Sequence, residues 1–194
     1  MMNFMKGIFL DTETNGLDWE RHSILEIAFV ICDLNSGKRI ETFSSLIKPT
    51  EDEWARGDPI SLEFTGITKS EVERGLEKAR AQKEIITIFK SHGIERGSSL
   101  FICQNPAFDR LFFSKLIPVT LQENILLPYN WLDLASMYWA KQIEEGADLD
   151  QIGLSKDRIA RHYKVPPEAR PHRALNGVEH LLLCYERVVG FPSC

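Results

Sequence analysis

The feature that most constrains the fold is a set of three strand-like segments near the N-terminus. Residues 7–13 (GIFLDTE) form a short apolar run that ends in acidic residues, and residues 24–33 (ILEIAFVICD) are rich in Ile, Val and Phe. A turn is indicated at Ser36-Gly37, and residues 39–47 (RIETFSSLI) then alternate as a half-buried strand does. Short connections between successive strands favour antiparallel neighbours, so we expect a β-meander at the start of the chain.

The rest of the sequence predicts mainly helices, with at least one further strand at residues 99–104 (SLFICQ). Asn105 is expected to cap the next helix, whose first residue is Pro106. Helices are expected over two short segments of residues 60–74 separated by Gly66, and over residues 81–93, 106–116, 131–143, 154–165 and 174–189. This order predicts an α/β fold in which a mixed sheet, antiparallel in its first three strands, is flanked by helices.

Length and composition are those of an ordinary globular protein. With 194 residues, 43% of them hydrophobic and 26% charged, the chain is expected to form a single domain over residues 1–194. No apolar run approaches the ~20 residues needed to span a bilayer, and the N-terminus lacks the long apolar stretch of a secretory signal. No two of the four cysteines, at positions 32, 103, 184 and 194, are spaced as a zinc knuckle or redox pair. We therefore expect a cytoplasmic protein without membrane contact.

Charge is unevenly distributed along the chain. The formal net charge is −5, which disfavours a protein that coats nucleic acid non-specifically. Between Lys156 and Arg173, however, six basic residues stand against two acidic ones, whereas residues 144–150 (EEGADLD) contain four acids. The basic run is either a solvated surface or a surface that attracts phosphates.

Two acidic residues lie at alternate positions where the first strand-like segment ends. Asp11 and Glu13 in DTET project from the same face of a strand, so their carboxylates are expected side by side. Like charges at this spacing keep one carboxyl protonated unless a cation is shared, and Mg²⁺ or Mn²⁺ prefers such oxygen ligands. Taken alone, DTETNG also fits a polar turn with a capping Asp.

Asp109 and His172 extend this pattern. Asp109 falls in the first turn of the helix expected after residues 99–104, where it is either a third carboxylate or an acid that complements the helix dipole. His172 lies in a proline-containing loop before the last helix. It is either a surface or capping residue or a general base, because histidine exchanges protons near neutral pH.

Together these segments resemble a known family. DTETNGL at 11–17, QNPAFD at 104–109 and HRAL at 172–175 occur in a compatible strand and helix order, and TGIT at 65–68 and WLDLASM at 131–137 agree with it. Over about residues 7–188, the chain resembles the DnaQ-like 3′→5′ exonucleases. The resemblance is to the branch with a histidine in its last motif (DEDDh), which includes the DNA polymerase III ε subunit, RNase T and oligoribonuclease. It implies a ribonuclease H-like fold and hydrolysis with two divalent cations, Mg²⁺ or Mn²⁺.

The resemblance also implies roles for individual residues. Asp11 would bridge both ions, Glu13 would hold the ion beside the nucleophilic water, and Asp109 would serve the second ion. His172 would take the proton from that water. The TNGL loop would border the pocket for the terminal nucleotide, and the basic run would attract the phosphate backbone. The expected substrate-binding residues are Thr12, Thr14, Gly16, Leu17, Asn105 and Phe108, with Leu17 and Phe108 against the base or sugar.

Gly177 departs from the family pattern, which places an acid five residues after the histidine. Leu181 and Cys184 continue an apolar helix face from this position, which predicts that Gly177 faces inward. Alternatively, Asn176-Gly177 is a local break that lets Asn176 or Glu179 approach the site. With Gly177 inward, one ion loses a carboxylate, and metal affinity and activity are expected to fall.

These observations predict a metal-dependent 3′→5′ exonuclease that releases nucleoside monophosphates from single-stranded DNA ends or short oligonucleotides. The alternative, favoured by Gly177, is an exonuclease-fold protein with weak or no catalysis that binds nucleic acid or accompanies a polymerase. A third interpretation is an RNA-trimming enzyme, since the 2′-OH contacts that select RNA cannot be located from sequence. The expected partners are single-stranded nucleic acid, DNA before RNA, and a DNA polymerase in replication or proofreading. We expect no separate polymerase-binding tail after the last helix.

Overall fold

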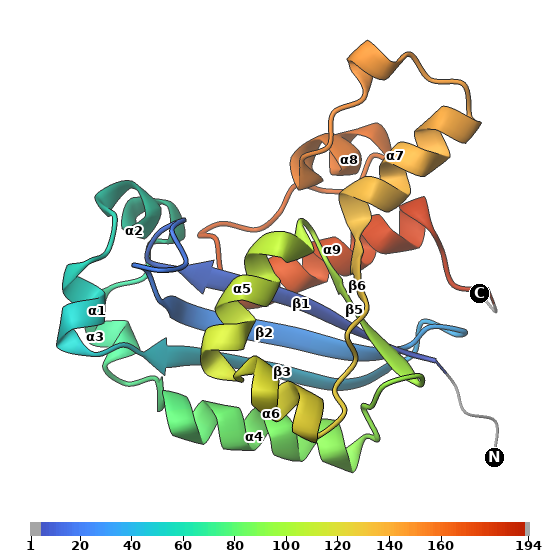
Figure 1. Ribbon diagram of the computed structural model, residues 1–194. Coiled ribbons are helices and arrows are strands. Elements are labelled where there is room, and N and C mark those ends of the chain that lie inside the picture. The colour runs from blue at the N-terminus through green and yellow to red at the C-terminus, as the bar shows by residue number, and fades with distance from the viewer. Residues whose placement is uncertain (1–4, 193–194) are drawn as a thin grey trace.

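In the computed structural model, which describes residues 5–192, six strands form one mixed sheet in the order β4-β3-β2-β1-β5-β6 (Figure 1). The strands are β1 (Lys6–Thr14), β2 (Ile24–Asp33), β3 (Arg39–Lys48), β4 (Leu76–Glu77), β5 (Ser99–Cys103) and β6 (Trp131–Asp133). β1 pairs with β2 and β2 with β3 in antiparallel fashion, whereas β5 runs parallel to β1 and β6 parallel to β5. The expected mixed sheet with an antiparallel start is confirmed.

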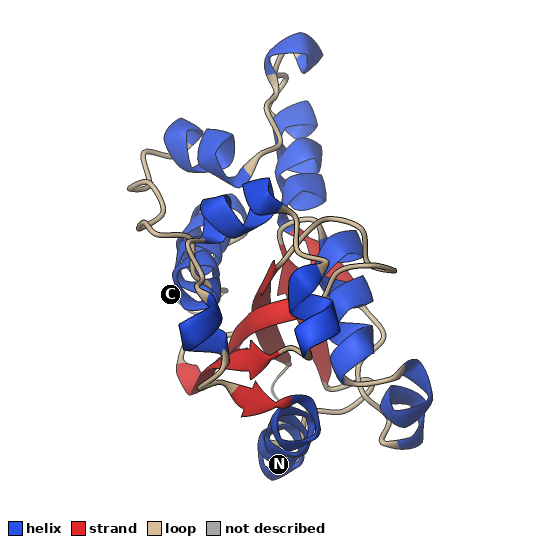
Figure 2. Ribbon diagram, turned by 90° about the vertical axis from the view of Figure 1, so that its left-hand side faces the viewer, coloured by secondary structure: helices blue, strands red, loops and turns tan. Residues whose placement is uncertain are grey.

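Helices cover both faces of the sheet (Figure 2). One face carries α4 (Lys78–Ser91), α5 (Pro106–Leu116) and α6 (Val119–Asn124), and the other carries α7 (Leu134–Glu144), α8 (Lys156–His162) and α9 (Ala174–Val188). The short helices α1 (Glu51–Ala55), α2 (Pro59–Thr65) and α3 (Lys69–Val72) lie at the end of the sheet toward which β1 runs (Figure 1). A 3₁₀ turn, η1, spans Leu149–Gln151.

The core has two layers because alternate residues of β1 point to opposite faces. Ile8 and Leu10 belong to the cluster beneath α4 and α5, whereas Phe9 packs edge-on against Tyr185 of α9, with ring centroids 5.0 Å apart. The nine residues Ile24–Cys32 of β2 are all buried, which explains why this strand is a nearly continuous apolar run. β1 is thereby fixed at the centre of the molecule.

The helix predicted over residues 131–143 is wrong at its start. Trp131–Asp133 form β6, in which Trp131 pairs with Phe101 and stacks on its ring at a centroid distance of 4.0 Å. The helix begins only at Leu134, because the Asp133 side chain accepts hydrogen bonds from the backbone N–H groups of Ala135 and Ser136. Pairing with a distant strand therefore overrides the local helical pattern.

Two further expectations about helix ends are corrected. Asn105 precedes α5 as predicted, but it adopts a left-handed conformation (φ 60°) and its side chain makes no capping hydrogen bond. The proposed break at Asn176-Gly177 is also wrong, since α9 runs uninterrupted from Ala174 to Val188. The sequence did not predict α1, β4 or α6, which are all short.

Three of the four cysteines, Cys32, Cys103 and Cys184, are buried free thiols, and Cys194 lies outside the described residues. Within residues 5–192, no helix combines the length and apolarity needed to cross a membrane.

Candidate active site

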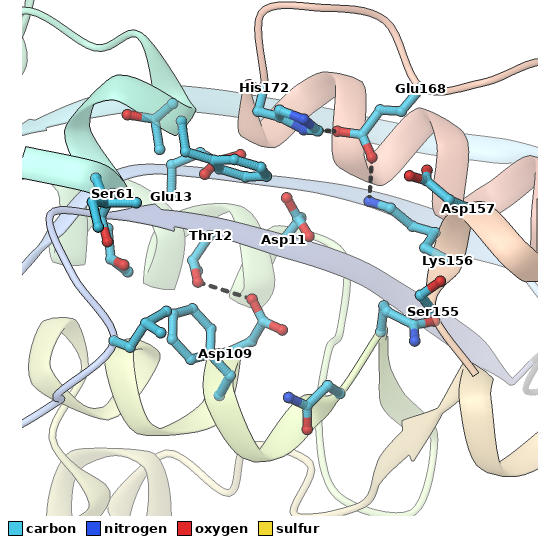
Figure 3. Close-up of a pocket in the computed structure, with 18 residues that line it drawn as sticks. Asp11, Thr12, Glu13, Ser61, Asp109, Ser155, Lys156, Asp157, Glu168 and His172 are labelled. Carbon is cyan, nitrogen blue, oxygen red and sulfur yellow. Dashed lines mark hydrogen bonds and ion pairs between the residues drawn. The ribbon is translucent and has the colours of Figure 1, made fainter. Parts of the chain in front are cut away.

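The end of β1 presents acidic side chains beyond the edge of its parallel neighbour. β5 pairs with β1 only as far as Phe9, whereas β2 pairs with β1 up to Thr14. Asp11 and Glu13 point to the side of the strand that faces His172, and Thr12 points to the opposite side (Figure 3). The predicted side-by-side placement of these two carboxylates is confirmed.

Asp109 joins this group from the first turn of α5. Its carboxylate is buried and accepts a 2.8 Å hydrogen bond from the Thr12 hydroxyl. Asn105, which precedes this turn, is held in place because its backbone N–H donates a 3.0 Å hydrogen bond to the Asp133 carboxylate. Three carboxylates from two distant segments therefore meet at the end of β1.

Burial and mutual repulsion raise the pKa values of all three carboxyl groups. Desolvation raises the pKa of Asp11 to about 6, against the opposing charge of Lys156. Desolvation, followed by the charge of Asp11, raises the pKa of Glu13 to about 8, and the same two causes raise the pKa of Asp109 well above its usual value. Without a bound cation, Glu13 retains a proton at neutral pH, whereas Asp11 takes one up only toward pH 6.

His172 is held between Phe64 of α2 and Glu168 of its own loop. Its ring stacks on Phe64 with centroids 4.1 Å apart and planes 13° from parallel, and its Nδ1 lies 3.2 Å from Glu168 Oε1. An ionised carboxylate only accepts hydrogen bonds, so Nδ1 donates and Nε2 of the neutral ring is left as an acceptor. Nε2 is buried and has no hydrogen-bond partner among residues 5–192.

Arg173 anchors the loop that carries His172. Its guanidinium lies 3.0 Å from a carboxylate oxygen of Glu26 in β2 and 3.0 Å from one of Glu71 in α3. Glu26 also accepts a 3.0 Å hydrogen bond from the Ala174 backbone N–H, at the start of α9. His172 is therefore held in position by its neighbour Arg173, which is ion-paired to β2 and α3.

The predicted role of the basic run needs correction at two positions. Arg173 is ion-paired inside the fold, and the half-buried Lys156 lies 2.7 Å from Glu168. The other basic residues of the run, Arg158, Arg161, Lys164 and Arg170, are exposed. Attraction of a phosphate backbone by the run therefore depends on those four residues.

Gly177 faces the carboxylates, as its helix position predicted. A Cβ atom at this position would lie 2.2 Å from Asp11 Oδ2 and 2.7 Å from Asp11 Cγ. The Asp11 side chain thus occupies the space that a side chain at residue 177 would need.

One cavity of about 540 Å³ is lined by the three carboxylates and by His172, Lys156 and Glu168. Its apolar wall consists of Leu17, Ile60, Phe64 and Phe108. Five of the six predicted substrate-binding residues line the cavity: Thr12, Thr14, Leu17, Asn105 and Phe108. Gly16 does not; it is buried against His22, whose ring would lie 2.4 Å from a Cβ there.

The donor chemistry of the cavity fits a hard divalent cation, because crowded carboxylates with raised pKa values are stabilised by a shared positive charge. Among residues 5–192, no group of three or more His, Cys, Asp or Glu side chains is gathered closely enough to coordinate an ion as it stands. Asp11 lies against Gly177 and Asp109 is bonded to Thr12. Coordination by these residues therefore requires their side chains to rotate.

Sequence reasoning missed Ile60, Phe64 and Glu168 as site residues. Ile60 and Phe64 are spaced i, i+4 on α2 and remain 76% and 59% exposed, an apolar pair that faces solvent rather than core. Glu168 is the one acid in the loop that carries His172, four residues before it. Its position four residues before His172 was the one feature of the sequence that could have indicated a place in the site.

The sequence of this chain is similar to those of known nucleases and of a polymerase. Residues 8–182 match the RNase_T family model, described as Exonuclease. An oligoribonuclease from Corynebacterium glutamicum (strain R) is 26% identical over 172 residues, which are 87% of this chain and 71% of that protein. A PolC-type DNA polymerase III from Mycoplasmopsis pulmonis is 27% identical over 131 residues, 67% of this chain but only 8% of the polymerase.

A solved structure shares the fold. E. coli exonuclease I in complex with a dT13 oligonucleotide superposes with a TM-score of 0.75 at 16% identity. The superposition covers 96% of this chain and 41% of exonuclease I. With most of its length matched by the family model, the chain belongs to the RNase_T family of DnaQ-like 3′→5′ exonucleases.

Proposed function

We propose that this chain is a divalent-metal-dependent exonuclease that releases nucleoside monophosphates from the 3′ ends of single-stranded DNA or short oligonucleotides. The observation that supports this most directly is the cavity shared by Asp11, Glu13, Asp109 and His172. Three acids, together with a histidine nitrogen that has no hydrogen-bond partner among residues 5–192, are the groups needed to hold cations and accept a proton.

Asp11, Glu13 and Asp109 are the proposed metal ligands, with Mg²⁺ or Mn²⁺ as the cation. When bound, two such ions supply positive charge that stabilises the attacking and leaving oxygens of the displacement. Two ions are proposed because the resemblance to the DnaQ-like exonucleases implies two.

His172 is the proposed general base. Water forms a bond to phosphorus while the bond between phosphorus and the 3′ oxygen of the preceding nucleotide breaks. The proton from the water moves to Nε2 of His172, which the Glu168 contact leaves as an acceptor. The leaving 3′ oxygen takes a proton from solvent, so the products are a shortened strand and a 5′-monophosphate.

The apolar wall binds the terminal nucleotide in this proposal. Leu17, Ile60 and Phe108 offer flat or branched apolar surface to a base or sugar, and Phe64 has the remaining ring face for stacking. The likeness to exonuclease I with its dT13 oligonucleotide supports DNA, and the likeness to oligoribonuclease supports short RNA. A DNA polymerase as partner is supported by the match to one segment of the PolC-type enzyme.

The test uses DNA and RNA oligonucleotides of the same sequence, labelled at the 5′ end, with Mg²⁺, Mn²⁺ or a chelator. We expect a ladder of products shortened one nucleotide at a time, abolished by the chelator and by Asp11→Ala. His172→Ala should lower the rate by roughly 10²–10⁴-fold, the usual contribution of a general base. Glu179→Gln, a change in the Arg39 ion pair on the outer side of α9, serves as the matched control and should retain activity.

Two outcomes would oppose the proposal. A ladder unaffected by Asp11→Ala would indicate a contaminating nuclease. Inactivity on both nucleic acids, even after Gly177→Asp, would favour the nucleic-acid-binding module instead. The ratio of the DNA and RNA rates decides the sugar preference.

A further inference from the structure

A fourth carboxylate, Glu168, lies in the same cavity as Asp11, Glu13 and Asp109. It belongs to the loop between α8 and α9, and its side chain is only 6% exposed. Figure 3 shows it between His172 and Lys156, on the side of β1 to which Asp11 points. The position where the family resemblance expects an acid, residue 177, carries no side chain and directly adjoins Asp11.

The loop holds Glu168 in place through both carboxylate oxygens. Oε1 lies 3.2 Å from His172 Nδ1, and Oε2 lies 2.7 Å from Lys156 Nζ. Lys156 in turn donates to the Gly177 carbonyl over 3.3 Å. The Glu168 carboxylate is therefore tied to the same turn of α9 that lacks an acidic side chain.

The pKa of Glu168 shifts in the opposite direction from the pKa values of Asp11 and Glu13. Burial raises its pKa, but the charge of Lys156 and the hydrogen bonds from Lys156 and His172 outweigh burial, and the net shift is downward. By contrast, the pKa values of Asp11 and Glu13 are raised, first by burial and in part by the negative charge of Glu168. Glu168, Asp11 and Glu13 thus share one electrostatic environment.

The bonds to Lys156 and His172 leave Glu168 able to bind a cation. A carboxylate has about four acceptor positions, and the two contacts within 3.2 Å use one on each oxygen. His180 Nδ1 also lies 3.7 Å from Oε2, beyond hydrogen-bond distance, so the remaining lone pairs are open to an oxygen-seeking cation in the cavity. Lys156 balances the charge of Glu168 before any cation binds, so the buried carboxylate is never unpaired.

We propose that Glu168 supplies, from the loop before α9, the carboxylate that Gly177 cannot supply, and that it is a ligand of the divalent cation nearest His172. Lys156 is a positioning residue that holds Glu168 beside α9. This inference rests on the proposed metal-dependent function. According to this inference, the site has the same number of carboxylate ligands as the family pattern, but one of them comes from residue 168 instead of residue 177.

The test measures Mn²⁺ binding by isothermal titration calorimetry on the full chain, with no nucleic acid present. Glu168→Gln retains the size of the side chain and an oxygen that accepts from His172, so it removes mainly charge and ligating strength. We expect it to weaken Mn²⁺ binding by about tenfold or more. Asp157→Asn removes an exposed charge from the wall of the same cavity and serves as the matched control, with a change of less than about threefold.

The second arm of the test is rescue. Gly177→Asp restores an acid on α9, so the double variant Glu168→Gln/Gly177→Asp should recover most of the lost Mn²⁺ affinity. A merely structural role of Glu168 would not be rescued from another segment of the chain. Melting temperatures of all variants confirm that they are folded.

The outcomes separate the inference from the proposed function. Wild-type affinity in Glu168→Gln, together with loss of Mn²⁺ binding in Asp11→Asn, would overturn the role of Glu168 and leave the metal site intact. Equal weakening by Asp157→Asn would likewise overturn it. So would absence of rescue in the double variant when Gly177→Asp alone, which displaces Asp11, still binds Mn²⁺. A wild-type protein that binds no Mn²⁺ would overturn the proposed function itself.

Discussion

Replacing Glu13 by Gln should stabilise the metal-free protein at neutral pH. The pKa of Glu13 is raised from 4.5 to about 8 in the folded chain, first by burial and then by the charge of Asp11. Between these two values the folded protein retains a proton that the unfolded chain releases. The contribution of Glu13 to stability is therefore fully present below pH 4.5 and is lost as the pH rises toward 8. Glutamine carries no charge at any of these pH values, so the variant avoids this loss.

The size of the effect follows from the two pKa values. One proton linkage between 4.5 and about 8 destabilises the wild type by about 3 kcal/mol at pH 7 and by about 1 kcal/mol at pH 5. For a domain of this length, 1 kcal/mol corresponds to ~2–4 °C in melting temperature. Glu13→Gln should thus melt ~6–12 °C above the wild type at pH 7, as an upper limit because the side chain is partly exposed, and only ~2–4 °C above it at pH 5.

The assay is thermal unfolding of both proteins in a chelator at pH 5, 6 and 7. The difference between the two proteins cancels groups common to both, such as His180, whose lowered pKa acts in the opposite direction. Glu179→Gln is the control and should show a small difference that does not grow with pH. Added Mn²⁺ should stabilise the wild type more than Glu13→Gln. Equal melting temperatures at pH 7, or a difference that does not grow from pH 5 to 7, would refute the reasoning.

Three further substitutions test the support of the site. Glu26→Gln leaves the Arg173 guanidinium without its buried carboxylate and should lower the free energy of unfolding by about 3 kcal/mol, measured in urea; a loss below about 1 kcal/mol would show that the pair does not anchor the loop. Asp133→Ala removes the N-cap of α7 and should lower the free energy of unfolding by about 1–2 kcal/mol, with faster amide exchange in the first turn of α7; unchanged exchange would contradict the capping role. Gly177→Ala should gain about 1 kcal/mol of helix propensity, but the new methyl group displaces Asp11. The net change in the free energy of unfolding, measured by calorimetric melting, should therefore stay within about 1 kcal/mol. A loss above about 3 kcal/mol would show that the Asp11 side chain cannot rotate.

The sequence by itself determined the antiparallel start of the sheet, the inward position of Gly177 and the acids at the end of β1. These features depend on local periodicity: side chains alternate along a strand and recur every three to four residues along a helix. β2 was predictable at its full length because burial on both faces makes it continuously apolar. The acidic and histidine motifs also indicated the exonuclease family, which the match over residues 8–182 confirms.

Only the tertiary structure decided which groups meet across the fold. Trp131 enters a strand because Phe101 offers a pairing edge and a ring to stack on, which no local propensity reveals. Phe64 stacks on His172 from a segment more than a hundred residues earlier in the chain. Glu168 is an ordinary loop acid in the sequence, and the partners that hold it ionised, above all Lys156, are fixed by the packing of α8 against α9. Such charges depend on distances between side chains and on burial, and those quantities exist only after the chain has folded.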